Sequence, residues 1–181
     1  DFINNLVFFP KLAAHGVSFR KQVFGGIINL ETCYYDSIDD RNGQNLAIEN
    51  SMLKSLIGFE KEIMQDFTAA FQYFSEYMLN YSDYKNSAIA LNQPIYKEKN
   101  HDWITLRLTN LQKQQTLTLS LFTYYSPAEK DWHLRPNANY KINDNLSIAC
   151  GANIFFGKYD YTFFGQLEDN TNAYMRLRYA F

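Results

Sequence analysis

The sequence predicts an all-β protein, and three observations lead to that prediction. Aromatic residues make up 17% of the 181 residues and apolar residues 46%, which is too many for a chain that stays solvated and disordered. No stretch approaches the roughly 18 consecutive apolar residues that a membrane-spanning helix needs. Apolar and polar residues instead alternate with a period of two along most of the chain, which indicates strands with one apolar and one polar face.

Nine segments of about ten residues carry this alternation. The clearest runs over 132–143, where Trp132, Leu134 and Tyr140 alternate with polar residues such as His133 and Arg135. A helix would repeat its apolar residues every three and four positions instead. We therefore expect antiparallel strands at about 12–19, 28–34, 53–59, 67–73, 104–109, 116–121, 132–143, 146–156 and 173–181.

The connections between these segments alternate in length. Those at 24–26, 63–65, 111–114 and 143–145 are short, that at 126–131 is intermediate, and those at 36–50, 81–100 and 157–171 are long. Transmembrane barrels sort their loops in this way, and strands of about ten residues suit a tilted membrane crossing better than a soluble sheet. The sequence therefore predicts an antiparallel transmembrane β-barrel; a soluble barrel or sandwich, with its apolar face inward, is the alternative.

Aromatic residues gather near the predicted strand ends, as in the girdles that barrels place at membrane interfaces. They are Tyr34, Tyr35, Tyr77, Tyr81, Tyr124, Tyr125, Trp132, Tyr179 and Phe181. Aromatic residues also favour strands in general, so the gathering alone does not separate the two alternatives.

The polar positions of the strands collect charge of opposite sign in the two halves of the chain. The later strands carry Arg107, His133, Arg135, Lys141, Arg176 and Arg178, and the earlier ones carry Glu31, Glu60 and Glu76, with Lys54 as an exception. A charge facing lipid costs about 2–4 kcal/mol at the membrane midplane, so we expect these residues to line a wet lumen. They either bias an open pore towards polar or anionic solutes, or pair with one another and fill a closed lumen.

Composition and motifs indicate no enzyme, cofactor, metal site or nucleic-acid partner. The 17 basic and 19 acidic residues are nearly balanced, and no P-loop, nucleophile elbow, HExxH or neighbouring Ser/His/Asp set appears. The two cysteines form neither a disulfide framework nor a zinc pattern. The acidic loop at 36–50 misses the EF-hand pattern because Ile38 stands at the first ligand position, so we expect a solvated loop, with a loose Ca²⁺ or lipopolysaccharide-bridging site as the alternative. Residues 168–170 form either a turn or part of a loop that narrows the mouth.

The last ten residues, Asn172 to Phe181, alternate up to a terminal Phe181 with Tyr179 two positions before it. This segment resembles the C-terminal β-signal of bacterial outer-membrane proteins. The stretch from Arg135 to Phe181, with its FFG, TFFGQ and EDN motifs, resembles the C-terminal end of a Gram-negative family of porin-like barrels. The resemblance implies an outer-membrane location, contact with lipid and lipopolysaccharide, and insertion by the outer-membrane assembly machinery reading Tyr179 and Phe181.

Residues 1–181 are expected to form a single barrel domain, the C-terminal part of a larger barrel, because single-chain bacterial barrels have an even strand number. A small complete eight-stranded barrel is the alternative. The expected function is porin-like passive transport of small polar or anionic solutes, in a homo-oligomer or with another envelope protein. A non-conducting structural or binding barrel that holds a partner or plug is the second possibility. An outer-membrane acyl-hydrolase and a soluble lipocalin-like binder follow.

Overall fold

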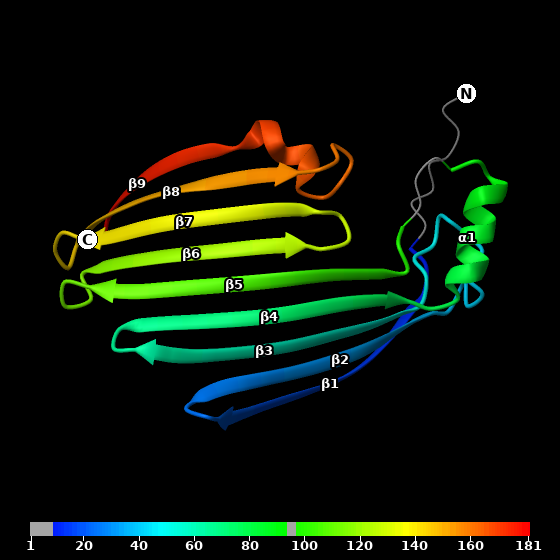
Figure 1. Ribbon diagram of the computed structural model, residues 1–181, viewed down its shortest axis with the longest axis horizontal. Helices are drawn as coiled ribbons and strands as arrows, with labels where there is room; N and C mark the ends of the chain where they lie inside the picture. Colours follow the sequence, from blue (N-terminus) through cyan, green and yellow to red (C-terminus); the bar gives the residue numbers. More distant parts are fainter. Residues whose placement is uncertain (1–8, 94–96) are drawn as a thin grey trace.

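Nine strands follow one another in sequence order across a single antiparallel sheet, as Figure 1 shows. The computed structural model describes residues 9–93 and 97–181. The predicted all-β antiparallel architecture with nine strands is confirmed for this part of the chain. The strands are β1 (Leu12–Val23), β2 (Gly26–Ser37), β3 (Met52–Met64), β4 (Phe67–Met78), β5 (Asn100–Gln112), β6 (Leu117–Ser126), β7 (Asp131–Lys141), β8 (Leu146–Gly157) and β9 (Asn172–Tyr179).

The sheet is open, with β1 and β9 at its two edges (Figure 1). Each edge strand pairs with one neighbour, β2 or β8 respectively. Since every neighbouring pair is antiparallel and the strands number nine, β1 and β9 run in the same direction.

The connections are sorted by length between the two ends of the sheet, as the sequence predicts. At the turn end, a few residues join β1 to β2, β3 to β4, β5 to β6 and β7 to β8. Phe24 (φ 52°), Gly25 (φ 74°) and Asp66 (φ 62°) adopt the left-handed conformation that these tight reversals require. The opposite end, here the loop end, carries residues 38–51, 79–93 with 97–99, 127–130 and 158–171.

Strand boundaries differ from the predicted ones where local chemistry interrupts the alternation. The first strand continues to Val23 because the polar run after Phe19 still pairs in register with β2. The seventh ends at Lys141, two residues early, because the Asn143 Oδ1 atom accepts hydrogen bonds from the Asn145 N–H (3.0 Å) and the Leu146 N–H (2.8 Å). These bonds fold residues 142–145 into a turn instead of a strand.

Two helices that the sequence analysis does not predict lie in the loops, α1 (Tyr81–Ala90) and η1 (Gly165–Asn170). The segment around α1 is joined to the 38–51 loop by the Asn80 side chain, which donates to the Arg41 carbonyl oxygen at 2.6 Å. Ala88 is the buried residue of α1. Neither helix of the described chain has the length and apolar character needed to cross a membrane.

Very few apolar side chains are buried within the described residues. They are Met52, Met78, Ala88, Ala149 and Phe164. No second sheet packs on the nine strands within residues 9–93 and 97–181. Most large apolar side chains of the sheet therefore lack the protein cover that a soluble sandwich supplies.

Candidate functional site

The strand register divides the side chains between two faces of the sheet. Residues directly opposite one another on paired strands point to the same face, and neighbours along a strand point to opposite faces. The face that contains the row Gly58, Gln72, Thr105, Tyr124 and His133 is here called the polar face. The face that contains the row Ile57, Tyr73, Ile104, Tyr125 and Trp132 is here called the apolar face.

All nine charged or titratable residues that the sequence singles out as lumen-facing lie on the polar face. They are Glu31 of β2, Glu60 of β3, Glu76 of β4, Arg107 of β5, His133, Arg135 and Lys141 of β7, and Arg176 and Arg178 of β9. Arg20, Lys54 and Glu62 share this face. The same alternation of residues along the strands places these three side chains on the polar face, so the sequence also predicts their positions.

Charge of opposite sign occupies the two halves of the polar face. In β1 to β4 four glutamates accompany Arg20 and Lys54, and Lys54 Nζ lies 2.7 Å from Glu76 Oε1 in an ion pair. In β5 to β9 Asp131 is the acidic residue of this face, against five arginines and lysines. Within the described residues none of these five forms an ion pair; they are Arg107, Arg135, Lys141, Arg176 and Arg178. The later half thus keeps uncompensated positive charge.

The apolar face exposes large hydrophobic side chains on every strand except β5. Met175 is 75% exposed, Val17 68% and Phe19 52%. Among the exposed large hydrophobic residues of the strands, Leu12 and Tyr174 are the two on the polar face. The Lys, Arg, Asp and Glu side chains of the apolar face stand near strand ends; they are Lys21, Asp36, Lys61 and Asp102. Contiguous apolar surfaces of this kind are typical of faces that contact another molecule.

Aromatic residues near the strand ends divide between the two faces. Tyr34, Tyr77, Tyr125, Trp132 and Tyr179 lie on the apolar face, and the Trp132 ring stacks on Tyr125 with a centroid distance of 4.0 Å. Tyr35 and Tyr124 lie on the polar face, so neither can belong to a girdle on the apolar face. Tyr81 belongs to α1, and Phe181 follows the end of β9.

The loop between β8 and β9 folds over the polar face at the loop end. Phe164 is 6% exposed, and its ring lies 5.3 Å from His133 and 5.7 Å from Tyr124 between centroids. The Phe164 N–H donates to Asp131 Oδ2 at 2.8 Å, and Asp131 is fully buried. This loop therefore covers the loop end of β6 to β8, and residues 168–170 lie in η1 within it.

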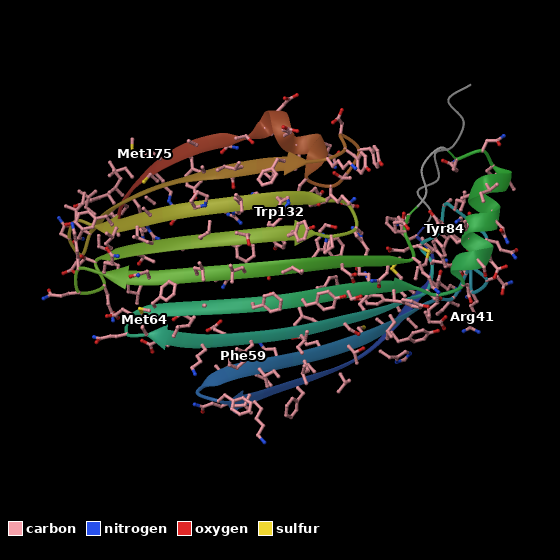
Figure 2. The ribbon with its side chains drawn as sticks, viewed as in Figure 1. Arg41, Phe59, Met64, Tyr84, Trp132 and Met175 are labelled. Atoms are coloured by element: carbon pink, nitrogen blue, oxygen red, sulfur yellow. The ribbon has the colours of Figure 1, made fainter. Side chains whose placement is uncertain are left out.

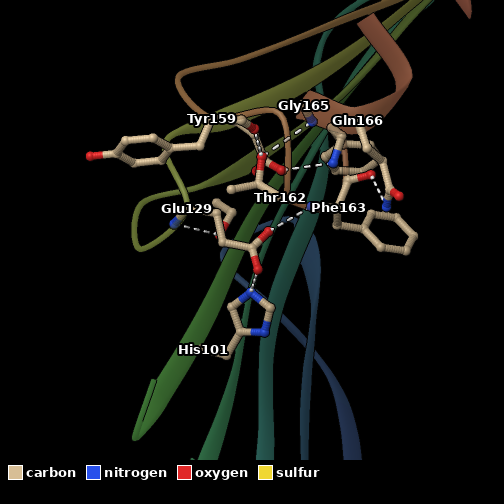
Figure 3. Close-up of polar contacts among 10 residues, drawn as sticks. His101, Glu129, Tyr159, Thr162, Phe163, Gly165 and Gln166 are labelled. Carbon is tan, nitrogen blue, oxygen red and sulfur yellow. Dashed lines mark hydrogen bonds and ion pairs between the residues drawn. The ribbon is translucent and has the colours of Figure 1, made fainter. Parts of the chain in front are cut away.

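A second anchor of the same loop is Glu129, which Figure 3 shows between His101 and Phe163. Its Oε2 accepts the Phe163 N–H at 3.1 Å, and its Oε1 lies 3.1 Å from His101 Nε2. Thr162 closes the loop on itself, since its hydroxyl donates to the Tyr159 carbonyl oxygen (2.8 Å) and accepts the Gly165 N–H (3.2 Å). Glu129 thus connects the loop to β5, in addition to the connection that Asp131 makes to β7.

Ser126, Asp131 and His133 come together on the polar face, which the sequence analysis did not anticipate. Ser126 stands directly opposite Asp131, and His133 is the next residue of β7 on the same face. Among the described residues no hydrogen bond joins the three side chains: Ser126 Oγ accepts from the Glu129 N–H (3.4 Å), and Asp131 holds Phe164. No group of three His, Cys, Asp or Glu residues in that part of the chain is placed to hold a metal ion.

The two residues of the predicted assembly signal are both accessible. Tyr179 ends β9 on the apolar face and is 66% exposed, and the Phe181 side chain is fully exposed. Asn145 holds the backbone between them: its carbonyl oxygen accepts the Ala180 N–H at 2.8 Å, and its side chain donates to the Ala180 carbonyl oxygen at 2.7 Å.

The polar face therefore combines fixed charges with a cluster of aromatic rings. The loop between β8 and β9 covers the loop end of this face. Comparison of the chain with protein-family models, with curated proteins and with solved structures found no match.

Proposed function

We propose that the chain forms the wall of a porin-like channel in a bacterial outer membrane. In this proposal the apolar face contacts lipid, and the polar face lines a water-filled lumen that admits small polar or anionic solutes. One observation carries the proposal: across nine adjacent strands, the mid-strand charges lie on one face and the exposed large hydrophobic side chains lie almost entirely on the other.

The distribution of charge along the strands supports a membrane on the apolar side. Arg107 and Arg135 stand in the middle of their strands on the polar face. On the apolar face, the charged Lys61 and Asp102 stand within four residues of a strand end. Lipid tolerates charge near the interfaces and penalises it at the midplane, so this is the distribution a membrane requires. Strands of 8 to 13 residues are also suited to a tilted crossing.

The open edges set a condition on the barrel. Unpaired backbone groups of β1 and β9 cannot remain exposed to hydrocarbon, so the sheet has to close through further strands. Because β1 and β9 run in the same direction, a wholly antiparallel closure needs an odd number of additional strands. These belong to the larger even-stranded barrel of our proposal or to another copy of the chain.

The uncompensated positive charge of β5 to β9 predicts a preference for anions. We expect the intact protein to form conducting channels in planar lipid bilayers, and the triple variant Arg135→Gln, Arg176→Gln, Arg178→Gln to lower the anion-to-cation permeability ratio several-fold. The matched control removes three lysines away from the polar face of the strands, Lys21→Gln, Lys61→Gln and Lys113→Gln, and should retain the ratio. An unchanged ratio in the arginine variant would refute the lumen-lining role.

A non-conducting binding barrel is the second candidate, and the covering loop favours it. The loop between β8 and β9 occupies part of the polar face through Phe164, as a plug would. Protein that inserts into bilayers but shows no conductance, in the same recordings, would support this candidate over the channel. In either case we propose contact with outer-membrane lipid and lipopolysaccharide, and recognition of Tyr179 and Phe181 by the assembly machinery.

A further inference from the structure

The polar face carries a cluster of aromatic rings that neither lipid contact nor a protein core accounts for. Phe74 and Trp103 stack at 5.6 Å on β4 and β5, and Phe122 meets Tyr124 edge to face at 4.8 Å on β6. All four residues are half-buried. On a face that carries charged and amide side chains, aromatic rings need a partner to leave water, since burial of apolar area is favourable.

Phe164 shows that this cluster accepts an aromatic ring from outside the sheet. Its ring lies against Tyr124, His133 and Phe155, at centroid distances of 5.3 to 6.3 Å. The imidazole of His133 in turn stacks on Phe155 at 4.2 Å with an interplanar angle of 17°. The half of the cluster nearest the loop end is therefore already occupied by the chain's own side chain.

The other half, around Phe122, has an arginine on each of the two neighbouring strands. Phe122 stands directly opposite Arg107 on β5 and Arg135 on β7. The Arg107 guanidinium lies 5.2 Å from the Phe122 ring centroid. Adjacent strands are about 4.8 Å apart, so the two arginine Cα atoms are separated by about 10 Å, with the backbone of Phe122 between them. Both arginines are exposed, and neither forms an ion pair in the described parts of the chain.

We propose that Arg107, Phe122 and Arg135 form a binding site for small aromatic carboxylates. A guanidinium binds a carboxylate through two parallel hydrogen bonds, and the ligand ring packs against Phe122 and the edge of Tyr124. The site rests on the proposed orientation of the polar face towards water, and it specifies the class of solute that the lumen takes.

The combination of groups separates this class from simpler ligands. A small inorganic anion would bind the arginines without needing Phe122. A neutral aromatic molecule would contact Phe122 and leave both guanidinium charges without a partner. Only a ligand with both features uses the ring and the cations together. Benzoate is therefore the probe, with acetate, cyclohexanecarboxylate and benzyl alcohol as its comparisons.

The test is isothermal titration calorimetry of benzoate into the intact protein in detergent micelles. We expect benzoate to bind at least tenfold tighter than acetate or benzyl alcohol, and several-fold tighter than cyclohexanecarboxylate. Arg107→Gln with Arg135→Gln should weaken benzoate at least tenfold, and Phe122→Leu should weaken it several-fold and abolish the preference over cyclohexanecarboxylate.

Two control variants remove the same groups elsewhere. Arg20→Gln takes a cation from the polar face of β1, and Phe71→Leu takes a phenyl ring from the apolar face of β4; both should retain wild-type affinity. Circular dichroism and heat-modifiable gel migration confirm folding of each variant. Benzoate that binds no tighter than acetate, or equally to wild type and to folded site variants, would overturn the inference. Binding with this pattern but without conductance would refute the channel and leave the site standing.

Discussion

The two faces of this sheet share one backbone, one set of hydrogen bonds and one set of strands, and they differ only in which alternate residues they display. The polar face carries charge at the middle of its strands and is covered by a loop at one end, whereas the apolar face exposes hydrophobic side chains and keeps charge near its strand ends. The backbone thus tolerates either surface, and the proposed function assigns lipid to the apolar side and water to the polar side. Figure 2 shows side chains standing along the whole sheet, and within residues 9–93 and 97–181 no second sheet packs on them.

The strongest way to break this comparison is to place a charge on each face at neighbouring positions of one strand. Leu121 faces the apolar side of β6 between Leu108 and Pro136, and Ser120 faces the polar side. Leu121→Arg should lower the free energy of unfolding from lipid vesicles by about 2–4 kcal/mol, because its guanidinium enters hydrocarbon. Ser120→Arg should change it by less than about 1 kcal/mol. Urea titrations followed by circular dichroism measure both, and equal losses would contradict the assignment of the faces.

The chain's two cysteines offer a second test, because each lies on a different face. Cys33 is half-buried on the polar face, and Cys150 is exposed on the apolar face. In membranes, a charged maleimide should modify Cys33 at least tenfold faster than Cys150, since only a hydrated thiol forms the reactive thiolate. The variants Cys33→Ser and Cys150→Ser isolate each rate by mass spectrometry. If water surrounded both faces, Cys150 would react faster because it is the more exposed thiol. Faster modification of Cys150 than of Cys33 in membranes would therefore refute lipid contact.

The two tryptophans also lie on different faces, and quenching of their fluorescence gives the smallest of the expected differences. Trp103 lies on the polar face beside Phe74, and Trp132 lies on the apolar face between Tyr125 and Phe156. In vesicles of brominated phospholipid, the fluorescence of Trp132 should fall at least twice as far as that of Trp103. Trp103→Phe and Trp132→Phe leave one reporter each, and equal quenching of the two would remove the distinction between the faces.

Most of the sheet could be predicted from the sequence because its signal is local. Alternation over a few residues identifies a strand and assigns each side chain to a face, which is why all nine proposed lumen residues share one face. The signal fails where alternation stops but pairing continues, as in the polar end of β1. It also fails for α1, which begins after Asn80 at a positive φ without a side-chain cap and buries only Ala88. Contacts with the 38–51 loop, distant in sequence, hold that segment instead.

The covered end of the polar face could not be predicted for a similar reason. Asp131 and Phe164 are 33 residues apart, and the sequence around neither residue indicates the hydrogen bond between them. Phe122 and Tyr124 occupy the positions of β6 that face the polar side. In the sequence they interrupt the alternation, because an aromatic residue counts as apolar. Their place on the polar face becomes meaningful only when the neighbouring strands bring Arg107, Arg135 and His133 beside them.

The unequal lengths of the connections limit where this protein can change during evolution. An insertion of one residue in a strand next to a tight turn, such as that at Phe24 and Gly25, would shift the pairing and exchange the two faces of everything that follows in that strand. An insertion within residues 38–51 or 158–171 leaves every register intact. Insertions can therefore accumulate in the loops of the loop end. Related proteins can acquire new binding surfaces there while the strands of the sheet keep their register.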